Sequence, residues 1–116
     1  MLDTNAVVAL LKEKKHEPGA ISVLTLIEVM RGLATEKRAL AKKLLEESFS
    51  VINLDNEVIE AYCSLYRELK RRGTPLPDAD LLIAATAMSR DLALETGDRH
   101  IKRLEEFGLK LAEPKR

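Results

Sequence analysis

The sequence is poor in aromatic residues. It contains no tryptophan, two tyrosines and two phenylalanines, so aromatic side chains make up 3% of its 116 residues. Modules that hold single-stranded nucleic acids by base stacking depend on such side chains. If this protein binds a nucleic acid, we therefore expect it to do so mainly through the phosphates and a reactive site.

Cysteine and long apolar runs are also scarce. The single cysteine, Cys63, allows no internal disulfide framework and no zinc cluster, and its apolar helical surroundings predict an inert core residue. There is no leader peptide pattern, and no apolar run approaches the roughly 20 residues that a membrane helix needs. We therefore expect a cytoplasmic protein that does not interact with membranes.

Neither sign of charge is in excess. The 19 Lys and Arg residues balance the 19 Asp and Glu residues. This argues against a protein that holds nucleic acid by a general positive field, although local basic patches remain possible. The hydrophobic content of 46% is sufficient for one core, and the length predicts a single domain over residues 1–116.

The hydrophobic pattern predicts strands that alternate with helices. The predicted strands are residues 1–2, 21–24, 50–54, 92–94 and 109–111, and the predicted helices are residues 6–15, 25–33, 36–47, 56–72, 80–90 and 98–107. Residues 80–90 are apolar nearly all round, which is typical of a buried helix. The alternation indicates the α/β class, with parallel strands and helices on both faces.

Four acids lie where predicted strands pass into helices. Asp3 follows the first strand, Glu28 lies one turn into the helix after the second, and Asp98 follows the strand at 92–94. Asp80 lies at the start of the buried helix. Ligands of parallel sheets bind beyond the carboxyl ends of the strands, so we expect these acids to meet at one edge.

Such a cluster of acids would favour a divalent cation. Two like charges about 4 Å apart repel by roughly 4 kcal/mol at an effective dielectric constant of 20. Mg²⁺ or Mn²⁺ would relieve that repulsion, because both prefer hard oxygen ligands. A cation held in this way can polarise a phosphate and activate water, which predicts phosphodiester hydrolysis.

Each acid also has a purely structural interpretation. Asp is a favoured helix N-cap, so Asp3 or Asn5 could cap the first helix and Asp98 a later one. Thr25–Glu28 fits the capping-box pattern, in which Glu28 bonds back to a backbone amide. Any one acid is better explained as a cap, but their joint placement favours a site. Asp55 also follows a strand, and we interpret it as a cap only.

Asp78 and Asp80 are both near the start of the buried helix. Two residues along a helix correspond to a rotation of about 200°, so regular helix cannot direct both at one metal. Asp80 shares a face with Ala84 and Ala87, whose small side chains allow a close approach. Asp78 lies nearer the helix end, where capping is expected. We therefore choose Asp80 as the ligand and keep Asp78 as a supporting residue.

At these residues the sequence resembles the PIN-domain family and, within it, the VapC-like toxins. The segments that carry the resemblance are Leu2–Asn5 (the opening acid motif), Thr25–Gly32 (the Glu-bearing helix), Asp80–Ala87 (close to the Asp-x-x-Ile-Ala-Ala signature) and Thr96–Asp98 (the last acid motif). The resemblance covers essentially the whole chain, with the motifs in the family's order and spacing.

The resemblance implies a three-layer α/β/α fold with a central parallel sheet. It also implies a Mg²⁺- or Mn²⁺-dependent ribonuclease that acts on single-stranded or looped RNA, forms a homodimer and is inhibited by an antitoxin protein. By the same resemblance Asp3, Glu28, Asp80 and Asp98 are the metal ligands and catalytic residues. Thr4, Asn5 and Thr96 would position ligands or water.

Basic residues near these acids are candidates for holding the RNA backbone. They are Arg31, Arg99, Lys102 and Arg103. The basic run Lys70–Arg72 is better explained as a solvated helix end that complements the helix dipole. The charged stretch at 35–47 carries an apolar stripe, which we interpret as core or as a groove for a partner helix.

Two other functions remain open. One is a phosphatase or phosphoacceptor domain with Asp3 as nucleophile, although phosphatases of the haloacid-dehalogenase type need a second Asp where this chain has Asn5. The other is a non-catalytic PIN-like module that binds RNA or protein. The presence of all four acids argues against the second function.

Overall fold

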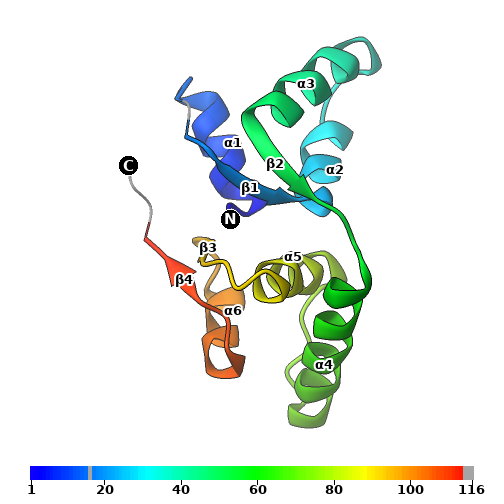
Figure 1. The fold of residues 1–116 in the computed structure, drawn as a ribbon, viewed down its shortest axis with the longest axis vertical. Coiled ribbons are helices and arrows are strands. Elements are labelled where there is room, and N and C mark those ends of the chain that lie inside the picture. Colours follow the sequence, from blue (N-terminus) through cyan, green and yellow to red (C-terminus); the bar gives the residue numbers. More distant parts are fainter. Residues whose placement is uncertain (16, 114–116) are drawn as a thin grey trace.

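The computed structural model describes residues 1–15 and 17–113, and it confirms the α/β class (Figure 1). Its elements are, in order, α1 (Thr4–Lys12), β1 (Gly19–Ser22), α2 (Val23–Arg31), α3 (Thr35–Ser48), β2 (Phe49–Ile52), α4 (Asn56–Arg72), α5 (Asp78–Ser89), β3 (Leu94–Glu95), α6 (Arg99–Lys102), the 3₁₀ helix η1 (Arg103–Phe107) and β4 (Leu111–Ala112).

All strand pairs in the described residues are parallel, as predicted. β1 pairs with β2, and β3 pairs with β4. The segment Met1–Asp3 runs between the two pairs and connects them. The Leu2 amide donates to the Ala20 carbonyl at 3.0 Å, and the Asp3 amide donates to the Glu95 carbonyl at 3.1 Å. The short predicted first strand is therefore the central link of the sheet, and Asp3 leaves from its carboxyl end.

Several element boundaries differ from the prediction. The first helix starts at Thr4 because Asp3 serves as its N-cap, and it ends at Lys12 because Lys14 adopts a positive φ of 54°. The predicted helix at 98–107 is divided into α6 and η1. The predicted strand at 92–94 moves to β3, because Asp91 at φ 55° belongs to the turn that ends α5.

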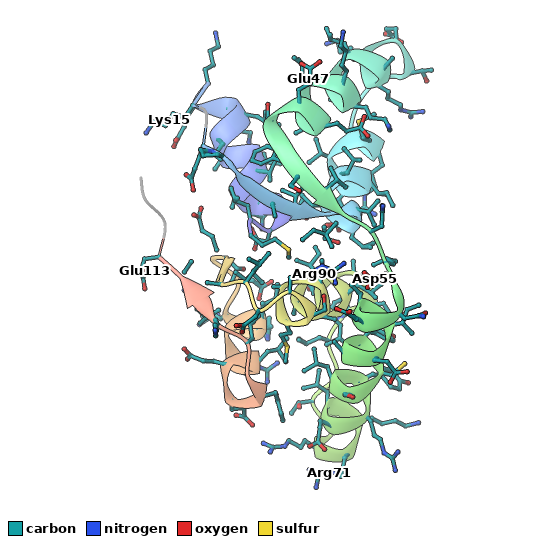
Figure 2. The ribbon with its side chains drawn as sticks, viewed as in Figure 1. Lys15, Glu47, Asp55, Arg71, Arg90 and Glu113 are labelled. Carbon is teal, nitrogen blue, oxygen red and sulfur yellow. The ribbon has the colours of Figure 1, made fainter. Side chains whose placement is uncertain are left out.

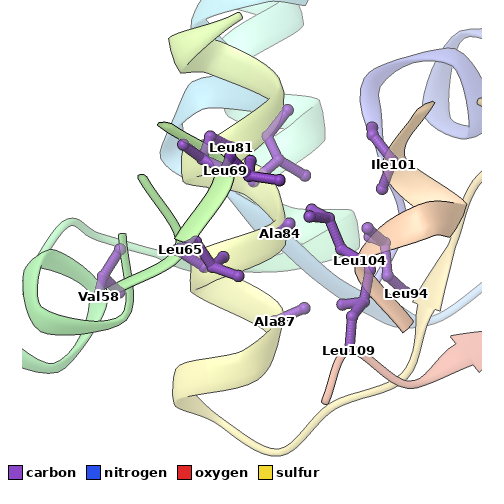
Figure 3. Packing of buried hydrophobic residues seen from close by; sticks show 12 residues of the cluster. Val58, Leu65, Leu69, Leu81, Ala84, Ala87, Leu94, Ile101, Leu104 and Leu109 are labelled. Atoms are coloured by element: carbon purple, nitrogen blue, oxygen red, sulfur yellow. The ribbon is translucent and has the colours of Figure 1, made fainter. Parts of the chain in front are cut away.

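Helix α5 forms the centre of the larger hydrophobic core (Figure 3). It is buried on several sides, as its apolar composition predicted, and its residues Ala84 and Ala87 are fully buried. Leu65 and Leu69 of α4 pack on one side of it, and Leu104 with its neighbours packs on the other. The small alanine side chains let these elements approach closely, which fixes the position of the first turn of α5.

The prediction that Cys63 lies in the core is wrong, because the structure exposes this residue. Helix α4 is amphipathic and buries Val58, Leu65 and Leu69 along one stripe. Cys63 lies five residues after Val58, which is a rotation of about 140° away from that stripe. An apolar-looking local sequence therefore did not identify the face that packs.

Candidate active site

The four predicted acids line one pocket. Its volume is about 230 Å³, and Asp3, Glu28, Asp80 and Asp98 all contribute to its wall. They come from the start of α1, the middle of α2, the first turn of α5 and the start of α6. The rest of the lining is Thr4, Asn5, Arg31, Ile83 and Ile101.

Asp3 and Asp98 are held in place by the helices that they cap. Asp3 Oδ1 accepts from the Ala6 amide at 2.9 Å. Asp98 Oδ1 accepts from the amides of His100 at 2.7 Å and Ile101 at 3.3 Å. Both structural interpretations are thus confirmed, but each cap bond uses only Oδ1. The cap therefore fixes the carboxylate and leaves Oδ2 outside these bonds.

Glu28 is not part of a capping box. The N-cap of α2 is Ser22, whose hydroxyl accepts from the Leu24 amide. Glu28 Oε1 instead accepts a hydrogen bond from the Thr4 hydroxyl at 2.5 Å. The capping-box alternative for Glu28 is therefore wrong, and its side chain is directed by the neighbouring helix α1.

A short chain of hydroxyl groups supports this contact. The fully buried Thr25 places its Oγ1 3.3 Å from Thr4 Oγ1. Because Thr4 has one hydroxyl proton and gives it to Glu28, Thr25 is the donor in the second bond. Sequence reasoning missed this role of Thr25. The signal was present, since Thr25 lies three residues before Glu28, but we read that spacing as a cap.

Asp80 shows that the four acids share one electrostatic environment. Burial, followed by the charges of Asp98, Glu28 and Asp3, raises the pKa of Asp80. Burial and the three carboxylates outweigh the helix dipole, which would by itself favour the charged form of an acid in the first turn of α5. The raised pKa marks a site of concentrated negative charge.

The carboxylate oxygens are the ligands that a hard divalent cation prefers. Their side chains, however, stand too far apart to bind one cation without moving. Among residues 1–15 and 17–113, no three His, Cys, Asp or Glu side chains stand at metal-ligating spacing. Mutual repulsion favours such separation, whereas a cation between carboxylate oxygens would offset it. The four carboxylates nevertheless line one pocket, where rotation of their side chains can shorten the oxygen–oxygen distances.

The supporting residues are placed differently from one another. Thr96 is buried, and its hydroxyl accepts from the Asp98 amide at 3.1 Å, so it orients the start of α6. Asp78 does not line the acid pocket. It does not cap its helix either, because the N-cap is Pro77. Instead, it accepts a hydrogen bond from the Tyr62 hydroxyl at 2.7 Å, which raises the pKa of Tyr62 to about 12.

Of the four predicted RNA-backbone residues, only one lines the acid pocket. Arg31 lines the acid pocket and lies 3.6 Å from Glu28 Oε2, with a side chain that is 72% exposed. The exposed residues Arg99, Lys102 and Arg103 do not line that pocket. Within the described part of the chain, none of these three cations forms an ion pair.

The comparison with known protein families decides the identity of the fold. A model of the PIN domain matches residues 1–106. The chain belongs to the PIN-domain family. This PIN domain is 36% identical over 115 residues to the ribonuclease VapC1 of Methanocaldococcus jannaschii, a match that covers 96% of this chain and 85% of the relative.

Solved structures agree with this assignment. The PIN domain superposes on a chain of VapBC-1 from nontypeable Haemophilus influenzae with a TM-score of 0.82, 25% identity and coverage of 97% and 96% of the two chains. DNA-bound VapBC from Salmonella typhimurium gives a TM-score of 0.82, 27% identity and the same coverage of 97% and 96%. The predicted resemblance to VapC-like toxins is confirmed.

Proposed function

We propose that this PIN domain is a divalent-metal-dependent endoribonuclease and the toxin of a toxin–antitoxin pair. The observation that carries the proposal is the convergence of four carboxylates, from four distant segments, on one pocket. The similarity to a protein named ribonuclease VapC1 supports RNA as the substrate. Similarity to solved VapBC complexes supports an antitoxin partner.

In this proposal Asp3, Glu28, Asp80 and Asp98 hold Mg²⁺ or Mn²⁺. When bound, the cation supplies Lewis-acid polarisation of the scissile phosphate and lowers the pKa of a bound water molecule. The chain supplies preorganisation. Helix caps fix two of the carboxylates, and the Thr4 hydroxyl fixes a third. Because these bonds form in the free protein, little ordering is left to the moment of reaction.

Arg31 is the residue best placed to receive a phosphate at this pocket. Its exposed guanidinium group lies at the rim, and its contact with Glu28 at 3.6 Å is long for a charge-assisted hydrogen bond. It can therefore exchange this contact for a phosphate oxygen of the RNA at low cost. Asn5, exposed at the same wall, is the polar residue available to orient water or substrate.

RNA cleavage by the purified protein with Mn²⁺ tests the proposal. We expect EDTA to abolish cleavage and Asp80→Asn, a nearly isosteric change, to abolish it with the fold intact. Asp91→Asn is the matched control, because Asp91 is exposed, lies at the opposite end of α5 and pairs with Lys110. Cleavage that persists in Asp80→Asn would exclude the assigned site. RNA binding without cleavage in the wild type would instead indicate a non-catalytic module.

We propose that the antitoxin binds between α1, α2 and α3. A mainly apolar groove of about 210 Å³ lies there, and Leu11 and Leu44 at its edge are 50% and 53% exposed. It includes part of the apolar stripe of α3 that the sequence left open as a partner groove. We expect Leu44→Glu to prevent complex formation with the antitoxin while RNA cleavage stays unchanged. Retained complex formation would place the antitoxin elsewhere.

The remaining predictions concern assembly. The homodimer and the single-domain organisation over residues 1–116 stay predictions, and light scattering of the purified chain measures the first directly. Within the residues that the structure covers, no helix is both long and apolar enough to cross a membrane.

A further inference from the structure

A second cavity shares α6 with the acid pocket. It has a volume of about 120 Å³ and is lined by the end of α4, the loop after it, α6 and η1. Leu69, Leu76 and Leu104 contribute apolar walls, whereas the charged or ionisable lining is Arg72, His100, Arg103 and Glu106. None of these side chains lines the acid pocket or the groove between α1, α2 and α3, and only Arg103 is among the residues that the sequence predicted to hold the RNA backbone.

The two cavities share one turn of the chain. Asp98 and Ile101 line the acid pocket, whereas His100 and Arg103 line the second cavity. The two sites are also close electrostatically, because His100, when it is protonated, opposes the rise of the pKa of the Asp80 carboxyl. Because one short segment, Asp98–Arg103, contributes side chains to both cavities, a polymer bound at the acid pocket has the second cavity within reach.

Arg72 has a structural role in this cavity. Its guanidinium group lies over the Phe107 ring, 4.7 Å from the centroid, and forms an ion pair with Glu106. These contacts tie the end of α4 to η1. The charge of Arg72 is thus already compensated by the protein, so we regard it as a fixed wall of the cavity.

Arg103 is different, because its charge is not compensated. No carboxylate among residues 1–15 and 17–113 forms an ion pair with it. Arg103 Nη2 lies 3.2 Å from His100 Nδ1. Since a guanidinium group can only donate, His100 Nδ1 is the acceptor in this contact, and the ring N–H that goes with it is on Nε2. Two side chains therefore present N–H donors at this cavity, and the carboxylate of Glu106 in its lining is paired with Arg72.

Resting on the proposed ribonuclease activity, we propose that this cavity binds a backbone phosphate of the RNA next to the scissile bond, with Arg103 and His100 as donors. A guanidinium fork matches phosphate oxygens in two-pronged geometry. The volume is small compared with typical ligand pockets of roughly 300–1,000 Å³, so it suits one backbone group. Contacts of this kind set the register of the strand without reading its sequence.

Binding of RNA to a chain that cannot cleave it provides the test. The probe is a fluorescein-labelled single-stranded RNA of about 12 nucleotides with random sequence, a length within the usual range of single-strand sites. Its anisotropy is measured with the Asp80→Asn protein as salt is varied. We expect Arg103→Gln in this background to raise the Kd about tenfold. We also expect the slope of log Kd against log salt to fall by about one.

Arg71→Gln is the matched control. It removes the same charge from an exposed side chain at the end of α4, where Arg71 pairs with Glu68 outside the cavity (Figure 2). We expect it to leave the Kd nearly unchanged, and we expect Arg103→Lys to recover part of the loss. Equal effects of Arg103→Gln and Arg71→Gln would overturn the phosphate site. A larger effect of Arg103→Gln on binding of a polyglutamate peptide than on RNA would also overturn it, by assigning the cavity to an acidic protein.

Failure of the two proposals can be told apart. If the Arg103 effect is observed but the wild type does not cleave RNA with Mn²⁺, the catalytic proposal fails and the phosphate site stands. If the wild type cleaves RNA and Arg103→Gln binds RNA as tightly as its parent, the phosphate site fails and the catalytic proposal stands.

Discussion

The hydrogen bond from Thr4 to Glu28 leads to a sharp prediction about catalysis. Thr4→Val replaces the hydroxyl group by a methyl group and removes the 2.5 Å contact to Glu28 Oε1. Glu28 is mostly buried, with 18% of its side chain exposed, so water replaces the lost donor poorly. Hydrogen bonds to charged groups contribute about 1.5–3 kcal/mol, which corresponds to a decrease in kcat/KM of roughly 10- to 100-fold.

The assay is steady-state cleavage of a labelled RNA with Mn²⁺, together with a thermal melt of each variant. We expect Thr4→Val to lower kcat more than it raises KM, because the hydroxyl positions a carboxylate and does not hold the RNA. Thr4→Ser keeps the donor and should retain most of the activity. Thr25→Val removes only the 3.3 Å bond behind Thr4 and should have a smaller effect.

The reasoning is refuted if Thr4→Val cleaves RNA as fast as the wild type. That result would mean that Glu28 reaches its working position without the hydroxyl group. Activity lost in parallel with a large drop in melting temperature in both Thr4→Val and Thr4→Ser would also contradict it, since the role would then be in folding.

Three further predictions concern stability and ionisation. Gly73→Ala should lower the free energy of unfolding by about 1 kcal/mol in urea titrations, because Gly73 ends α4 at φ 70°; an unchanged midpoint would contradict this. Arg90 lies beside Asp55 (Figure 2), and its hydrogen bond lowers the pKa of Asp55. The stability that Asp55 adds relative to Asp55→Asn is therefore present above the usual pKa of Asp and should disappear as the pH falls through the lowered pKa. A difference in stability that stays constant at acidic pH would argue against the ion pair. Asp78→Ala should lower the pKa of Tyr62 from about 12 toward the ordinary value of 10.0 in an ultraviolet absorbance titration, and no shift would exclude the hydrogen bond as its cause.

Much of the fold was predictable because its signals are local. Residues 80–90 are apolar all round, and a helix of that kind has to be buried whatever surrounds it. The strand positions were less certain. The predicted strand at 109–111 is displaced to β4 at Leu111–Ala112, because a two-residue strand is defined only by its pairing with β3. Cys63 was misplaced for a related reason, since the packed face of α4 depends on where α5 lies.

The sequence by itself determined which acids stand at the starts of helices and that four of them belong to PIN-type motifs. It also determined that Asp3 and Asp98 can cap, because that bond involves only neighbouring residues. Only the tertiary structure decided between the two interpretations of Glu28, since its partner Thr4 lies 24 residues away and the local capping box was equally possible. The sequence had already favoured Asp80 over Asp78, but only the tertiary structure identified their surroundings, Tyr62 for Asp78 and three carboxylates for Asp80. Contacts between distant segments depend on packing, and short-range patterns do not encode them.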